Sequence, residues 1–125
     1  MGLIDGLLGN ASEIDPVKLQ NELAKLLADG ESIDRAYQLI RDLIVFTNKR
    51  LILIDKQGIT GKKIEYHSIP YRSIIHFTIE TSGHFDLDAE LKIWISGSST
   101  PIQREFNRRL NIYEVQSVLA FYVLK

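Results

Sequence analysis

Hydrophobic and polar positions along the chain follow helical spacing first, strand alternation next, and helical spacing again at the end. Asp15 and Pro16 predict a helix start, because aspartate caps free backbone N–H groups and proline fits the first helical position. The helix is expected to run to about Ala28, with Gly30 in the positive-φ conformation that ends a helix. Its apolar stripe contains Val17, Leu19, Leu23, Leu26 and Leu27.

The middle of the chain alternates with a period of about two residues, which is the spacing of β-strands. Asn48 and Lys49 lie between two apolar runs and form a tight turn, so they predict a β-hairpin. Seven short strands are expected in this region. They are residues 37–40, 43–47, 51–55, 62–69, 73–81, 87–96 and 102–106.

Two of these strands have one apolar and one polar face. In residues 73–81 the apolar side is expected to carry Ile75, Phe77 and Ile79. In residues 87–96 the alternation is clear enough that a one-residue slip would bury charged side chains. The aliphatic face of that strand comprises Leu87, Ala89, Leu91, Ile93 and Ile95, and the opposite face comprises Asp88, Glu90, Lys92, Trp94 and Ser96.

A second helix is predicted at the C-terminal end. Asn111, with Glu114 three residues later, resembles a capping box, in which the two side chains satisfy free N–H groups of the first turn. The apolar face of this helix comprises Ile112, Val115, Val118, Leu119 and Tyr122. The whole pattern predicts a mainly β protein with flanking helices, a seven-stranded, partly open β-barrel or sandwich capped by the C-terminal helix. We expect one domain, residues 1–125, with an N-terminal helical segment (1–29), the β-barrel (30–110) and the capping helix (111–125).

Composition excludes several classes of function. The 125 residues are 45% hydrophobic and 25% charged, which is typical of a globular domain. A formal net charge of −1 gives no overall attraction for nucleic acid or an anionic bilayer. With no cysteine, the chain excludes disulfides, thiolate catalysis and cysteine-ligated metal sites. The start of the chain lacks the features of a secretory signal, and no apolar run approaches the about 20 residues of a membrane-spanning helix, so a cytoplasmic location is expected.

Five short strings in the strand region carry a family resemblance. They are Phe46-Thr47-Asn48-Lys49-Arg50-Leu51-Ile52-Leu53-Ile54-Asp55, Gln57-Gly58, Thr60-Gly61-Lys62-Lys63, Ile69-Pro70-Tyr71 and Gly83-His84-Phe85-Asp86-Leu87-Asp88. Together they resemble the bacterial pleckstrin homology (PH) domain family, small prokaryotic proteins of unknown function, over nearly the whole chain. The resemblance implies a PH-like barrel, no known enzymatic activity and ring-like homo-oligomers.

Some apolar side chains are left over once a small barrel has closed. Trp94 lies on the polar face of its strand, where a large ring is partly wet unless something covers it. Leu3, Ile4, Leu7 and Leu8 form an apolar segment that is too small for a core of its own. The cover is either the protein's own N-terminal helix or another subunit. Exposed edges of the predicted sheet give copies a further route to pair, and together these features agree with self-association. We therefore expect these five residues to be partner-binding, in a non-enzymatic module that assembles with copies of itself and presents a surface to another protein.

A competing interpretation uses the basic residues. Lys49, Arg50, Lys62 and Lys63 are candidate anion-binding residues, because lysine and arginine on one rim hold phosphate by charge-assisted hydrogen bonds. This alternative function is an anionic lipid or phosphate binding module at the inner membrane surface. The opposing view is that these side chains are solvated at turns and strand ends, so a membrane lipid partner is not favoured, and a nucleic acid partner is not expected.

Metal binding and catalysis are not expected. His84, Asp86, Asp88 and Glu90 resemble a ligand set, but alternate residues of a strand rise about 6.7 Å, too far for all four to close on one ion. The histidines His67, His76 and His84 have no nucleophile elbow, phosphate loop or orienting acid beside them. We therefore expect no catalytic residues, no metal site and no cofactor.

Overall fold

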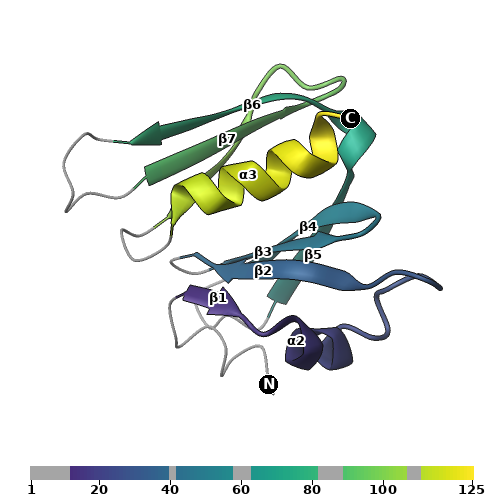
Figure 1. The fold of residues 1–125 in the computed structure, drawn as a ribbon. Coiled ribbons are helices and arrows are strands. Elements are labelled where there is room, and N and C mark those ends of the chain that lie inside the picture. The colour runs from purple at the N-terminus through teal and green to yellow at the C-terminus, as the bar shows by residue number, and fades with distance from the viewer. Residues whose placement is uncertain (1–11, 40–41, 58–62, 82–88, 107–110) are drawn as a thin grey trace. The chain divides into compact units, whose positions relative to one another are not determined.

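The described strands belong to two separate sheets, one of five strands and one of three, and they do not close into a single hydrogen-bonded barrel. This computed structural model describes residues 12–39, 42–57, 63–81, 89–106 and 111–125 (Figure 1). The chain divides into two compact units, Met1–Ile69 and Pro70–Lys125. The mainly β class with flanking helices is confirmed, and the assignment of one domain stays a prediction.

The first unit contains the five-stranded sheet. Its elements are β1 (Ser12–Ile14), α2 (Pro16–Glu22), β2 (Ile33–Gln38), β3 (Leu43–Thr47), β4 (Arg50–Gln57) and β5 (Lys63–Pro70). The strands lie in sequence order, β1-β2-β3-β4-β5; α2 and the turns after it separate β1 from β2, and shorter connections join the later strands. Strand β1 lies within the segment expected to be helical, so the prediction of seven strands is wrong and eight are described.

The helix α2 begins as expected and ends early. Asp15 caps it by accepting a hydrogen bond from the Val17 N–H at 3.0 Å, and Leu19 and Leu23 are buried against the sheet. The prediction that the helix runs to Ala28 is wrong, because it ends at Glu22. Beyond that point the chain forms turns. The Leu27 N–H still bonds to the Leu23 carbonyl, but the Ala28 N–H bonds to the Glu31 side chain and the Leu26 carbonyl accepts a hydrogen bond from Arg50.

Strands β3, β4 and β5 were predicted to within two residues, and β2 was not. The boundaries of β3 are those expected, and all five of its residues are buried, as the unbroken apolar run indicated. β3 and β4 form the predicted hairpin around Asn48 and Lys49. Strand β2 begins at Ile33, earlier than expected, since its first half pairs with β3 despite the charged residues it contains.

The second unit contains the three-stranded sheet and the C-terminal helix. Its elements are the 3₁₀ turn η1 (Tyr71–Ser73), β6 (Ile74–Thr81), β7 (Ala89–Ile95), β8 (Ile102–Phe106) and α3 (Ile112–Val123). Asn111 caps α3 through its side chain, which accepts hydrogen bonds from the Tyr113 and Glu114 N–H groups. The rings of Tyr71 and Tyr122 stack with centroids 4.5 Å apart, which attaches α3 to the turn before β6. None of the described helices could span a membrane.

A β-bulge changes the faces of β6. Ile74 pairs with Ile95 and His76 pairs with Trp94, so Ile75 is an extra residue with no partner on β7. The expectation that Ile75 is on the apolar face is wrong, because it is 60% exposed while Ile74 is buried. The extra residue reverses the alternation at this point, as bulges do.

A buried carboxylate joins three parts of the first unit. The Glu31 side chain is 1% exposed, and its oxygens accept hydrogen bonds from the Arg50 Nε at 2.8 Å, the Arg50 Nη2 at 3.0 Å and the Thr47 hydroxyl at 2.7 Å. A fourth bond comes from the Ala28 N–H at 2.9 Å. The same guanidinium donates to the Leu26 carbonyl at 2.8 Å. The turns after α2 are therefore bound to the β3–β4 hairpin through one charge pair, which we call the Glu31–Arg50 cluster.

The cluster changes the acidity of Glu31. Burial alone would raise the pKa, but the hydrogen bonds from Arg50, Ala28 and Thr47 and the charge of Arg50 outweigh burial and lower the pKa from 4.5 to about 2. The folded protein thus binds a proton at this carboxylate less readily than the unfolded chain does. A lowering of this size corresponds to about 3 kcal/mol of stability at neutral pH.

Glu31→Gln should lower the free energy of unfolding at pH 7 by about 2–4 kcal/mol, because it leaves the charge of Arg50 without its buried partner. Urea denaturation followed by circular dichroism measures this. The matched control is Glu13→Gln, which removes the exposed ion pair between Glu13 and Arg35. That control should cost less than about 1 kcal/mol. Equal losses in the two variants would contradict a special role for the cluster.

Acid should destabilise the protein through Glu31 in a defined range. Because its folded pKa is lowered, the stabilisation is fully present above about pH 5 and is lost as the pH falls from 4.5 toward 2. Denaturation curves of the wild type and Glu31→Gln at a series of pH values should converge over this range. A constant difference between the two proteins down to pH 2 would show that the charge of Glu31 is not the cause.

Candidate functional site

The polar face of the three-stranded sheet gathers aromatic and charged side chains in rows across its strands. Antiparallel register sets His76 opposite Trp94, and Thr78 opposite Lys92, which in turn is opposite Gln103. These residues share one face because side chains alternate along a strand. Leu91 and Ile93, on the other face of β7, are fully buried, so the predicted alternation of this strand is confirmed. We call the polar side the Trp94 face.

Trp94 and His76 form a stacked pair. Their ring centroids are 4.4 Å apart with 28° between the planes, an offset-stacked arrangement typical of aromatic side chains. Trp94 is half-buried and His76 is exposed. The large ring of Trp94 is therefore supported by a neighbouring ring and still reaches solvent.

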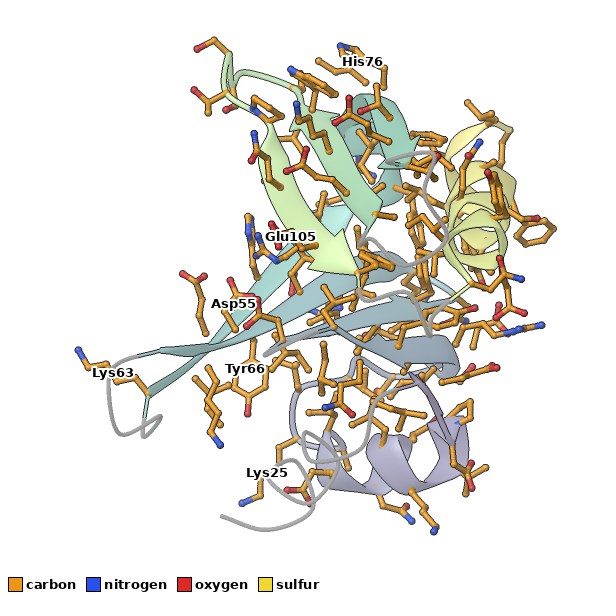
Figure 2. All side chains as sticks on the ribbon, turned by 90° about the vertical axis from the view of Figure 1, so that its left-hand side faces the viewer. Lys25, Asp55, Lys63, Tyr66, His76 and Glu105 are labelled. Carbon is orange, nitrogen blue, oxygen red and sulfur yellow. The ribbon has the colours of Figure 1, made fainter. Side chains whose placement is uncertain are left out.

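Three glutamates form one row across the same face. Glu80 pairs with Glu90 across β6 and β7, and Glu90 pairs with Glu105 across β7 and β8. Directly opposite residues have Cβ atoms about 5 Å apart, so the three carboxylates repel one another. Lys92 offsets part of this repulsion, since its Nζ lies 3.7 Å from Glu90 Oε1. His76 and Glu105, labelled in Figure 2, come from the two edge strands of the sheet.

A hollow of about 310 Å³ lies on this side of the sheet. It is lined by Thr78, Ile79, Glu80, Lys92 and Trp94. Its lining combines one aromatic ring, one cation and one carboxylate, which are groups that form stacking and ionic contacts. Among the described residues, no group of three or more metal-ligating side chains could hold an ion.

Among the described candidate anion-binding residues, Lys63 lies apart from Arg50. Lys49 is exposed in the β3–β4 turn, and Arg50 beside it uses four of its five N–H donors on Glu31, Leu26 and Ser68. Lys63 begins β5, five residues before Ser68, which corresponds to about 16 Å along the strand. Figure 2 shows Lys63 at the far end of the β4–β5 hairpin. This spacing does not favour one patch formed by all these residues.

Several predicted site residues lie outside the described part of the chain. They are Leu3, Ile4, Leu7 and Leu8 of the partner-binding set, Lys62 of the anion-binding set, and His84, Asp86 and Asp88 of the rejected ligand set. Of the predicted partner-binding residues, only Trp94 can therefore be located.

The sequence did not indicate the glutamate row or the stacked histidine. Glu90 was expected on a polar strand face, but its alignment with Glu80 and Glu105 depends on the register of three strands. Register follows from turns and bulges, and the extra residue Ile75 shifts that of β6. An alternation pattern with an allowance for one bulge is the signal that would have paired His76 with Trp94.

A model of the bacterial PH domain family matches residues 2–123 of the chain. The protein belongs to the bacterial PH domain family. This confirms the resemblance carried by its sequence strings. Among curated proteins, it is 60% identical over 121 residues to the uncharacterized protein YjqA of Bacillus subtilis, covering 96% of this chain and 97% of that protein. It is also 38% identical over 98 residues to the uncharacterized protein YozO of the same organism, covering 78% and 83%.

Solved structures of bacterial PH domains have the same fold. The PH domain from Shewanella amazonensis has 55% identity and a TM-score of 0.83, with 99% of this chain and 100% of that chain covered. A protein of family DUF1696 with a PH domain, from Shewanella loihica, has 50% identity and a TM-score of 0.81, covering 91% and 97%. These likenesses settle the fold of this bacterial PH domain, and they carry no information on a ligand or reaction.

Removing one carboxylate from the row should stabilise this bacterial PH domain. Glu105→Gln should raise the free energy of unfolding by about 0.2–1 kcal/mol at low salt, because it relieves the repulsion with Glu90. Glu105→Lys should raise it further, since a cation then lies opposite Glu90. Both gains should shrink at about 1 M salt, where the Debye length is about 3 Å. A loss of stability at low salt in both variants would contradict the repulsion.

Proposed function

We propose that this bacterial PH domain is a non-enzymatic interaction module that associates with copies of itself, and that the Trp94 face is one of its contact surfaces. The observation that carries the proposal is the half-buried Trp94 stacked on His76 amid charged side chains. Tryptophan is enriched among the residues that dominate binding energy at protein interfaces. A ring already held by its neighbour also loses little conformational freedom on binding.

The apolar N-terminal residues belong to the same proposal. Leu3, Ile4, Leu7 and Leu8 are kept as partner-binding residues on the strength of the sequence. Burial of such side chains contributes about 1.5–3 kcal/mol each, so they would add appreciably to the association of subunits.

The negative charge of the glutamate row favours a basic partner at the Trp94 face. The repulsion among Glu80, Glu90 and Glu105 is unfavourable within one chain, and a lysine or arginine brought opposite the row would relieve it. A second protein as partner would therefore present a basic edge to this row.

The lipid or phosphate alternative has less support. Arg50 is engaged with Glu31, and Lys63 is about 16 Å along β5 from the residue that contacts Arg50. Membrane binding by basic residues requires several cations near the surface together, at about 1 kcal/mol each.

Trp94→Ala and Leu7→Asp should each weaken self-association at least tenfold, about 1.4 kcal/mol, because they remove apolar contacts at the interface. Light scattering and sedimentation velocity over a concentration series measure the mass. Val17→Asp is the control, since Val17 is 70% exposed on α2 and the substitution adds the same charge. A wild type that is monomeric at every concentration, or unchanged masses for both variants, would overturn the proposal.

Liposome co-sedimentation tests the alternative separately. With vesicles that contain phosphatidylserine, we expect no binding at about 0.05 M or 0.15 M salt. Binding that falls with salt and is lost in Lys49→Gln together with Lys63→Gln would instead support the lipid function.

A further inference from the structure

The helix α3 is apolar on two opposite sides. Its buried residues Ile112, Val115, Leu119 and Tyr122 face the rest of its own unit, where α3 lies alongside β6 and η1 (Figure 1). Its other side carries three of the most exposed large apolar residues in the described chain. These are Tyr113 at 66%, Phe121 at 68% and Leu124 at 68%. A helix that is apolar on both sides is typical of one buried on both sides.

The exposed side has regular spacing. Tyr113, Ser117, Ala120 and Leu124 follow one another at intervals of four, three and four residues, so at about 100° per residue they fall within about 60° of one another. Phe121 lies about 40° beyond this sector. We call these five residues the outer stripe of α3, of which Leu124 is the C-cap residue directly after the helix. Intervals of four and three residues are those at which two helices interlock their side chains.

The intervals of four, three and four residues are the same when the outer stripe is followed from either end. If a second copy of α3 lies antiparallel, Tyr113 faces Leu124 of that copy and Ser117 faces its Ala120. The small residues then meet at the centre, where they allow the axes to approach to about 8 Å, and the large residues meet at both ends. The stripe is thus complementary to itself in size under a two-fold rotation, as the contact of a symmetric dimer must be.

Charges at the two ends of the helix agree with that direction. Glu114 lies in the first turn and Lys125 follows the last turn. An antiparallel pair brings the carboxylate of one copy near the ammonium of the other, whereas a parallel pair would set like charges side by side. Antiparallel helix dipoles are also mutually favourable.

From this complementarity we infer that the outer stripe of α3 is a two-fold contact with α3 of a second copy of the chain. The inference rests on the proposed self-association and specifies one of its interfaces. The contact is small: three aromatic and aliphatic side chains about two-thirds exposed amount to roughly 400 Å² per copy, about half of what a stable interface buries. The contact therefore acts together with other contacts of the assembly.

Cysteine cross-linking tests the contact directly, since the chain has no cysteine of its own. A mixture of Ser117→Cys and Ala120→Cys proteins, oxidised in glutathione buffer, should give at least fivefold more disulfide dimer than Val17→Cys. A mixture of Tyr113→Cys and Leu124→Cys should do the same. Tyr113→Cys alone should not, because two copies of residue 113 then lie about 16 Å apart along the axes.

The mass of Phe121→Glu gives a second measurement. Circular dichroism verifies that its fold is kept, and its mass by light scattering should be lower than that of the wild type at the same concentration. Cross-linking of Tyr113→Cys with itself, or no cross-linking in either mixture, would overturn the antiparallel contact.

The two proposals fail in different ways. If Trp94→Ala and Leu7→Asp lower the mass while Phe121→Glu leaves it unchanged and the mixtures stay uncrosslinked, self-association stands and the α3 contact is wrong. If the mixtures cross-link and Phe121→Glu lowers the mass while the other two variants have no effect, the α3 contact stands and the Trp94 surface is wrong. A wild type that is monomeric throughout and gives no cross-links overturns both.

Discussion

The carboxylate of Glu31 constrains the first unit more than any other single group described. It has almost no contact with water and is compatible with the folded state only while Arg50, Thr47 and the Ala28 N–H satisfy its oxygens. Those partners come from the turns after α2 and from the β3–β4 hairpin. The same contact therefore joins the chain between helix and sheet to the β3–β4 hairpin.

Local patterns predicted the elements whose structure depends on neighbours in sequence. Asp15 and Asn111 cap their helices as expected, and β3 and β8 have the predicted boundaries. The errors occur where distant groups compete with local preference. Leu26 has helical spacing, but its carbonyl accepts a hydrogen bond from Arg50, which lies on β4, and the Ala28 N–H bonds to the nearby Glu31 side chain that the same Arg50 holds.

Less of the candidate site than of the fold could be predicted, because the site depends on contacts between residues that are distant in sequence. Trp94 could be recognised as a large ring on a polar face from the alternation of its own strand. To predict its stacking on His76 and the alignment of Glu80 with Glu90, the register between the strands must be known. The extra residue Ile75 shifts that register. The basic residues illustrate the opposite error. Arginine is a residue type that often binds anions, but the guanidinium of Arg50 pairs with Glu31 inside the fold. The outer stripe of α3 does not stand out in the sequence, because the apolar face toward the core already accounts for the helical spacing of apolar residues.

The bulge at Ile75 also affects whether a strand of another molecule can pair with β6. β6 is an edge strand, and a regular edge of exposed N–H and C=O groups is a template for the strands of other molecules. An unpaired residue in the first half of β6 interrupts that template and increases the local twist. Such an irregular edge hinders copies of the chain from pairing their backbones into open-ended fibrils.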